Sequence, residues 1–226
     1  MTIAEITTTP TVDELARHLV ALLGQRPASR RVIVAVAGGP GSGKSHISQR
    51  VCQAINGASE LAVVVPMDGF HLPRAHLLAM EDPAQALQRR GAPWTFDAQG
   101  FVAAVQRIRS DTASVTRVPA FDHAAGDPVA DAIAVGPQHR IVLVEGLYAH
   151  AGEAPWAQVG AALADELWWI EPADARASHA RLAQRHVAAG LARDREAADE
   201  RIARNDALNG AYAEKTRLSA TRTIMN

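Results

Sequence analysis

Four continuous apolar runs divide the chain, and each has the length of one strand rather than of a helix. Runs without polar alternation are typical of parallel strands, because helices cover both faces of such a sheet. A helical pattern over residues 44–55 joins the first two runs and completes a βαβ unit. The pattern predicts an α/β fold with a mostly parallel sheet and helices on both faces. The four runs cover residues 31–37, 61–65, 141–144 and 167–170.

Further helices are predicted outside these runs. Residues 11–14 read Thr-Val-Asp-Glu, the pattern of a capping box, and Leu15, Leu19 and Leu22 follow at helical spacing. Longer stretches with helical character cover residues 98–109, 173–189 and 195–215.

The connection between the second and third apolar runs is longer than a plain crossover requires. It holds a predicted helix and two short β-like pieces at 115–118 and 133–135. Long connections in compact domains usually serve a site. We therefore expect one domain over residues 1–226, with an inserted cap over about residues 69–136 and a helical lid over about residues 173–195.

Composition and charge narrow the classes of function. The chain has 226 residues, of which 48% are hydrophobic, and its formal net charge is −1. The nearly equal numbers of basic and acidic residues give no net positive charge that would attract nucleic acid or an anionic membrane, so neither is expected as a partner. No apolar stretch approaches the ~20 residues that span a bilayer, and no secretory signal is evident. We expect a cytoplasmic protein, with a homodimer as the candidate assembly because closed dimers are the commonest.

The candidate chemistry begins with a glycine-rich loop between the first apolar run and the helix after it. Residues 38–45 read Gly-Gly-Pro-Gly-Ser-Gly-Lys-Ser and satisfy the pattern G-x-x-x-x-G-K-[ST]. Such a loop turns its backbone N–H groups toward phosphate oxygens, at the positive end of the following helix. Lys44 is expected on the β- and γ-phosphates of ATP, and the Ser45 hydroxyl on Mg²⁺. The residues assigned to nucleotide binding are Gly38, Gly39, Pro40, Gly41, Ser42, Gly43, Lys44, Ser45 and His46.

Two acidic residues follow neighbouring apolar runs. Asp68 comes after the second run and Glu145 directly follows the third, so both belong to the carboxyl edge of the sheet, where ligands bind. Asp68 could take a proton from an attacking hydroxyl; the alternative is a residue that caps a loop or helix. Glu145 has the position of a carboxylate that holds Mg²⁺; the alternative is an ordinary strand end. Which of the two is the base stays open.

Arginines gather in the predicted helix at 173–189. Arg181 and Arg185 are four residues apart and share one face. Arginines that close over a transferring phosphoryl group stabilise its developing charge, which assigns both a catalytic role beside Lys44. A solvated basic face is the alternative.

Short motifs follow one another along the chain. They are the loop at 38–45, Met-Asp-Gly-Phe-His (67–71), Arg-Gly-Ala-Pro-Trp-Thr-Phe-Asp (90–97), Pro-Ala-Phe-Asp-His (119–123), Val-Glu-Gly (144–146) and Arg-Leu-Ala-Gln-Arg-His (181–186). In this order they resemble the phosphoribulokinase/uridine kinase family of P-loop kinases, over about residues 31–209. The subgroup that is most similar is the bacterial nucleoside/nucleotide kinase-like or fructose-transport-kinase group. Type I pantothenate kinase is a more distant relative.

The resemblance implies a P-loop NTPase fold, a three-layer sandwich, and transfer of the γ-phosphoryl group of ATP to the hydroxyl of a small molecule. It implies that Asp68 is the base and that Ser45 and Glu145 serve Mg²⁺. Arg181 and Arg185 would belong to the lid. The implied acceptor pocket is lined by Phe70, His71, Phe121, Asp122 and His123.

Two residues of the motif at 90–97 carry open alternatives. Trp94 could stack on a ring or a sugar, but packing in the core is favoured. Asp97 either ends the turn before the helix at 98–109 or faces the substrate.

We expect an ATP-dependent kinase whose acceptor is a sugar such as fructose or a nucleoside, ahead of a pantothenate-like alcohol. The alternative is a nucleotide-dependent regulatory ATPase or switch protein without a small-molecule acceptor. The sequence lacks the Asn-Lys-x-Asp motif of GTPases and the Leu-Ser-Gly-Gly-Gln-like signature of transporter ATPases. The intact loop, Asp68 and Glu145 disfavour a binder that has lost the transfer reaction.

Overall fold

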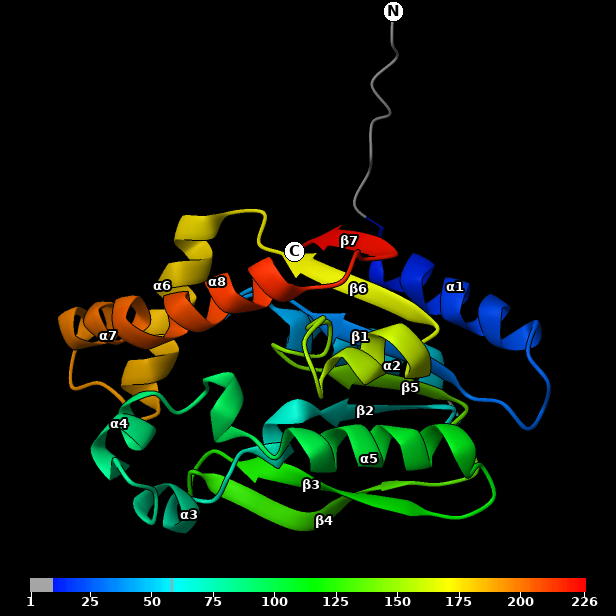
Figure 1. Ribbon diagram of the computed structural model, residues 1–226. Helices are drawn as coiled ribbons and strands as arrows, with labels where there is room; N and C mark the ends of the chain where they lie inside the picture. Colours follow the sequence, from blue (N-terminus) through cyan, green and yellow to red (C-terminus); the bar gives the residue numbers. More distant parts are fainter. Residues whose placement is uncertain (1–9, 58) are drawn as a thin grey trace, which may run out of the picture.

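The structure is a computed structural model that describes residues 10–57 and 59–226. Its main sheet contains the strands β1 (Val32–Ala37), β2 (Ala62–Pro66), β5 (Ile141–Glu145), β6 (Glu166–Glu171) and β7 (Arg222–Met225). They lie in the order β2-β5-β1-β6-β7, and every neighbouring pair is parallel (Figure 1). The predicted parallel sheet is confirmed, and β5 lies between the strands of the first βαβ unit.

The predicted helices are present with nearly the expected bounds. Thr11 and Glu14 form the reciprocal hydrogen bonds of a capping box at the first of them. The stretch predicted at 195–215 is helical throughout, with a π-helical turn, η4 (Ile202–Asp206), in its middle. Within the described residues, no helix is both long and apolar enough to cross a bilayer. The α-helices are α1 (Val12–Gly24), α2 (Lys44–Asn56), α3 (Arg74–Leu78), α4 (Pro83–Gln88), α5 (Ala98–Ser110), α6 (Ala175–Ala188), α7 (Arg195–Arg201) and α8 (Ala207–Thr216).

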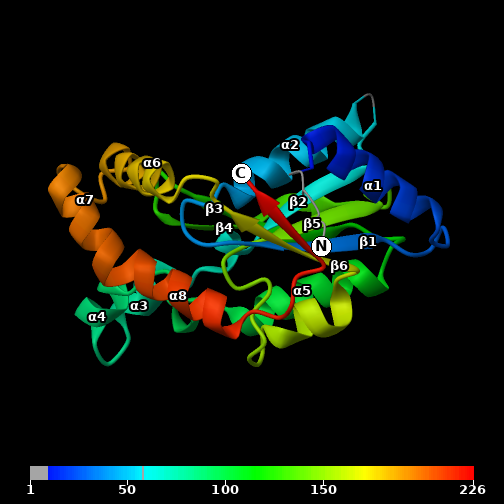
Figure 2. The same cartoon turned by 90° about the horizontal axis from the view of Figure 1, so that it is seen from above.

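Alternate side chains of β1 face opposite layers, which explains why its sequence is apolar throughout. Val32, Val34 and Val36 join a buried cluster with residues of α1 and α2. Ile33 and Ala35 join the larger cluster on the other face, which includes the buried side of α5. Figure 2 shows α1 and α2 on one side of the sheet and α5 on the other. The three-layer α/β sandwich of a P-loop NTPase is therefore confirmed.

The segment between β2 and β5 forms the structure around one end of the sheet. It begins with a 3₁₀ turn, η1 (Met67–Phe70), and includes a second one, η2 (Pro93–Thr95). After α5, the strands β3 (Thr116–Asp122) and β4 (Asp127–Val135) form an antiparallel hairpin. The predicted helix and the two β-like pieces are confirmed. Helices α3 and α4 were not predicted, since five or six residues are too few to show a helical period.

Strand β7 was not predicted either. Only Ile224 of its four residues is buried, so the sequence shows no apolar run there. The strand nonetheless extends the sheet beyond β6, pairing from Trp168 with Arg222 to Glu171 with Met225.

Candidate active site

The glycine-rich loop connects β1 to α2 at the carboxyl edge of the sheet. The N–H of Ser42 donates to the Gly39 carbonyl at 3.1 Å, and that of Ile47 donates to the Gly43 carbonyl at 3.0 Å. Gly43 has the left-handed backbone conformation (φ 89°), which lets the loop turn directly into the helix. Helix α2 thereby presents the unpaired N–H groups of its first turn, beginning at Lys44, to an anion.

A cavity of about 220 Å³ lies over this loop. Helix α6 supplies its opposite wall, so Arg181 and Arg185 face the same space as Lys44. The structure therefore brings both arginines to the loop, as the lid prediction requires, while their catalytic role stays a prediction. The lining residues are Gly41, Gly43, Lys44, Ser45, His46, Arg181, Leu182 and Arg185.

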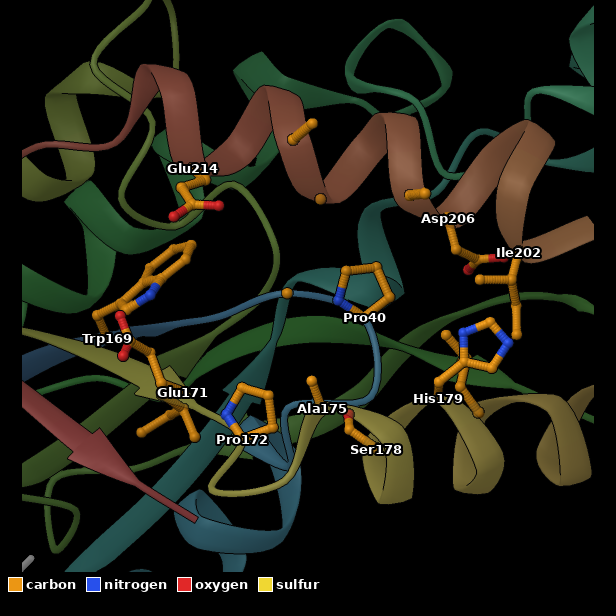
Figure 3. Close-up of a pocket in the computed structure, with 16 residues that line it drawn as sticks. Pro40, Trp169, Glu171, Pro172, Ala175, Ser178, His179, Ile202, Asp206 and Glu214 are labelled. Carbon is orange, nitrogen blue, oxygen red and sulfur yellow. The ribbon is translucent and has the colours of Figure 1, made fainter. Parts of the chain in front are cut away.

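A larger cavity of about 610 Å³ adjoins the loop from the side of β6. Figure 3 shows Pro40 reaching into it between helix α8 and helix α6. Trp169 forms part of its wall, with the carboxylates of Glu171 and Glu214 on the same side. This cavity was not predicted, because its walls come from segments far apart in the sequence. Its size suits a flat heterocycle and a sugar.

Glu145 is the buried carboxyl group of the site. Its side chain lies at the end of β5 and the residue is 6% exposed. Burial raises the pKa of Glu145 to about 7, the nearby Lys44 charge opposes this rise, and the Asp68 charge adds to it. The Ser45 hydroxyl and Arg185 also interact with the carboxylate. The loop, the α6 arginines and the two acidic residues therefore form one cluster.

Asp68 lies in η1, directly after β2. Pro66 at the end of that strand is paired with Glu145, so Asp68, two residues further on, lies close enough for its charge to act on Glu145. Gly69 lets the carbonyl of Pro119 approach, since a Cβ at position 69 would lie 2.2 Å from that oxygen. Within the described residues, no hydrogen bond is made to the Asp68 carboxylate, which does not support the capping alternative. The group is half-buried at the mouth of the cluster.

His71 is the centre of an aromatic stack on the hairpin side of Asp68. Its ring lies 4.0 Å from that of Phe96 and 4.9 Å from that of Phe121, and Phe121 contacts His123 at 5.2 Å. The ring nitrogen Nδ1 is 2.8 Å from the Asp68 carbonyl oxygen. Burial lowers the pKa of His71, and the nearby Asp68 charge opposes this fall. The structure thus gathers three of the five predicted acceptor-side residues.

The other two predicted acceptor-side residues have different surroundings. Phe70 is buried in the core, where its ring packs edge-on against Phe101 at 5.2 Å. Asp122 accepts hydrogen bonds from the N–H groups of Ala124 (2.8 Å) and Ala125 (3.2 Å), which closes the turn of the β3–β4 hairpin. Each therefore has a structural contact of its own, and a substrate contact for either stays a prediction.

Arg90 joins this side of the site, although the pattern of residues did not assign it a role. Its guanidinium forms an ion pair with Asp127 at 2.8 Å and donates to the Leu72 and Gly126 carbonyls. It also lies over the Phe121 ring, 5.4 Å from the centroid. The only feature of the sequence that could have indicated a role for Arg90 is its position as the first residue of the motif at 90–97.

The remaining open residues of that motif are now placed. The Asp97 carboxylate accepts from the Gly100 N–H and caps α5, which confirms its structural alternative. Trp94 is 47% exposed, so the expectation that it packs in the core is wrong. Its place on the short turn η2 leaves the ring at the surface, where it lines an open groove with Trp156. Trp156, Trp168 and Trp169 are buried.

The fold and this site define a nucleotide-binding protein of the P-loop class. No family model matches the chain. A Schizosaccharomyces pombe protein named as a candidate uridine kinase is 39% identical over 208 residues, which are 90% of this chain and 85% of that protein. An ATP-dependent kinase-like protein of Aspergillus versicolor is 48% identical over 161 residues, 70% of this chain and 92% of that protein.

Solved structures agree with these relatives. A crystal structure described as a candidate fructose transport system kinase from Silicibacter sp. TM1040 has a TM-score of 0.78 at 35% identity and covers 95% of this chain and 98% of its own. The structure of YFH7 from Saccharomyces cerevisiae superposes with a TM-score of 0.83 at 24% identity, over 96% of this chain and 99% of its own, and shows the shared fold. The chain belongs to the phosphoribulokinase/uridine kinase family of P-loop kinases. It is an ATP-dependent phosphotransferase.

Proposed function

We propose that the protein transfers the γ-phosphoryl group of ATP to a hydroxyl group of a sugar or a nucleoside. The observation that carries this proposal is the cluster in which the Glu145 carboxylate lies near Asp68 and near the charges of Lys44 and Arg185. Phosphoryl transfer requires little covalent chemistry from the protein, and depends on positioned charges around the phosphates and a group that receives the acceptor's proton. This cluster contains both.

The donor side consists of the two cavities around the glycine-rich loop. The phosphates of ATP would occupy the 220 Å³ cavity, against the loop N–H groups, Lys44 and the two α6 arginines. The adenosine would leave the loop at Pro40 and occupy the 610 Å³ cavity beside Trp169. Helix α6 contributes to both cavities, which supports a lid role for residues 173–195.

Magnesium is the cofactor that this donor set fits. Mg²⁺ keeps several waters and binds through one or two carboxylates plus substrate phosphates. Among the described residues no group of three His, Cys, Asp or Glu side chains could hold a metal by itself. The Ser45 hydroxyl and the Glu145 carboxylate are oxygen donors beside the phosphate cavity. They would hold the ion, which would supply positive charge that offsets the charge of the phosphates.

The acceptor side is the space between Asp68 and the aromatic stack of His71. Asp68 would receive the proton of the attacking hydroxyl, since its carboxylate has no other hydrogen bond among the described residues. The rings of His71, Phe121 and His123 offer faces and nitrogen atoms to a polar ring-shaped molecule. The segment at 69–136 would accordingly be the acceptor cap. Relatives named for uridine and for fructose transport support a nucleoside or a sugar.

The test is ADP release across a panel of sugars, nucleosides and pantothenate-like alcohols. We expect turnover that depends on the acceptor and falls about 10²–10⁴-fold in Asp68→Asn. Asp131→Asn is the matched control, because it changes an exposed carboxylate on β4 of the same cap, at a residue with no assigned role in the site. Turnover that needs no acceptor and is unchanged in Asp68→Asn would favour a regulatory ATPase instead.

A further inference from the structure

The side chain of Asn226 contacts the glycine-rich loop from outside the nucleotide cavity. Its amide nitrogen Nδ2 donates a 2.9 Å hydrogen bond to the carbonyl oxygen of Ser42. These two residues are 184 positions apart in the sequence. No step of the proposed reaction uses Asn226, which does not line either cavity.

Strand β7 and its surroundings fix the backbone at this position. The Asn226 N–H donates to the Glu171 carbonyl at 2.8 Å, and the Asn226 carbonyl accepts from the Ala173 N–H at 2.8 Å. The buried side chain of Ile224 anchors the strand in the core two residues earlier. Figure 2 shows β7 beside β6, with the end of the chain beyond its tip. The amide group of Asn226 is therefore presented to the loop by a well-held backbone.

The contact with Ser42 has a consequence on the opposite side of the same peptide unit. In a trans peptide the C=O and the following N–H point in opposite directions. A donor that holds the Ser42 carbonyl outside the loop therefore turns the Gly43 N–H toward the inside. Within the described residues the Gly43 N–H has no hydrogen-bond acceptor, so it is available to an anion in the phosphate cavity, which Gly43 lines.

The absence of a side chain at Gly43 makes room for the Asn226 amide group. A Cβ at position 43 would lie 2.0 Å from Asn226 Nδ2, so the side chain occupies the space that glycine leaves. The preceding peptide is held in the same manner, because the Ser178 hydroxyl on α6 donates to the Gly41 carbonyl at 2.7 Å. Successive carbonyls of the loop are thus bound by side chains from two different elements, α6 and β7.

We propose that Asn226 is a positioning residue for the phosphates of the nucleotide, because its hydrogen bond to Ser42 orients the Gly43 N–H into the phosphate cavity. The proposal rests on the proposed function only in that the loop binds ATP or ADP. It does not depend on the identity of the acceptor.

Calorimetric titration with ADP tests this role without any acceptor. Asn226→Leu keeps the shape of the side chain and removes the donor, and we expect the Kd for ADP to rise about tenfold. Asn226→Gln keeps an amide donor and is expected to recover part of the affinity. Thr221→Ala is the matched control: its hydroxyl ties the same segment to Leu167, away from the loop, through two hydrogen bonds of 3.0 Å.

A merely structural role predicts a different result. If Asn226 only fastened strand β7, Asn226→Leu and Thr221→Ala would lower the denaturant midpoint alike and leave the Kd for ADP unchanged. That outcome overturns the proposal, as does equal loss of ADP affinity in the two variants. If no acceptor in the panel increased ADP release, the proposed function would be contradicted. The ADP titration would still decide the role of Asn226.

Discussion

The hydroxyl of Tyr148 donates a 2.7 Å hydrogen bond to the carbonyl of Gly91. Tyr148 follows β5 three residues after Glu145, and Gly91 lies in the segment between β2 and β5, so the bond ties that segment to the carboxyl edge of the sheet. The tyrosine is fully buried and packs against Phe96 and Trp156. We expect Tyr148→Phe to lower the free energy of unfolding by about 1–2 kcal/mol, because the Gly91 carbonyl loses its donor.

The same variant should separate the two substrates in the kinase assay. The KM for the acceptor is expected to rise while the KM for ATP stays the same, since the bond lies on the cap side of the site. Tyr212→Phe is the control, because its hydroxyl contacts Glu153 at the surface, at 2.6 Å. Equal changes in both KM values for Tyr148→Phe would contradict the assignment of the cap to the acceptor.

Arg181 and Arg185 provide the second prediction. Both line the phosphate cavity from α6, opposite Lys44. Replacing either one by Gln should lower kcat about 10²–10³-fold, the usual loss when one preorganised donor to a developing charge is removed. Arg176→Gln on the same helix changes an exposed arginine outside this cavity and should leave kcat close to wild type. A similar kcat in all three variants would favour the solvated basic face.

Arg31 supports the third prediction, which concerns stability. Its side chain is fully buried and donates to the backbone carbonyls of Ile108, Asp111, Gly136 and His139, at 2.6–2.9 Å. Arg31→Met fills similar space but leaves these acceptors without a donor, so the free energy of unfolding should fall by roughly 3–5 kcal/mol.

The neighbouring Arg30 is the control for this change. Its side chain is 51% exposed and pairs at 3.2 Å with the buried Asp165, which Arg26 and Arg109 also contact, so the carboxylate keeps partners when Arg30 is lost. Arg30→Met should cost less than about 1 kcal/mol. Urea denaturation of both variants measures the difference, and comparable losses would show that the buried hydrogen bonds of Arg31 contribute little.

Sequence reasoning succeeded where the signal is local. Strand β1 is apolar at every position because both faces are covered, and the loop at 38–45 has its glycines and Lys44 in one continuous stretch. Asp68 and Glu145 could then be placed near that loop, because parallel strands have their carboxyl ends on the same side of a sheet. These inferences need no knowledge of how distant segments pack.

The features that escaped prediction depend on contacts between distant segments. The 610 Å³ cavity requires α6, α8 and the loop to meet, and the Asn226 contact requires an edge strand with a single buried residue. Trp94 was wrongly predicted for a related reason, since the sequence does not show whether any other segment covers its ring. An aromatic residue in a motif is usually buried, but a turn as short as η2 can leave its ring at the surface.

The last prediction concerns pH and His150. Its ring is buried, and Nε2 donates to the Ala35 carbonyl at 2.7 Å. Burial lowers the pKa of His150 to about 4, whereas that of an unfolded histidine is about 6.5. Protonation therefore favours the unfolded chain: the stabilisation is complete above about pH 6.5 and falls, by about 3 kcal/mol in all, as the pH drops to about 4.

Denaturant unfolding of wild type and His150→Gln between pH 4 and 7 isolates this contribution. The glutamine amide can still donate to Ala35 but does not titrate, so the variant should lose less stability than wild type as the pH falls. His76→Gln, which changes an exposed histidine on α3, should retain the wild-type pH dependence. If His150→Gln follows the wild-type curve between about pH 6.5 and 4, the buried ring is not the group that makes folding sensitive to acid.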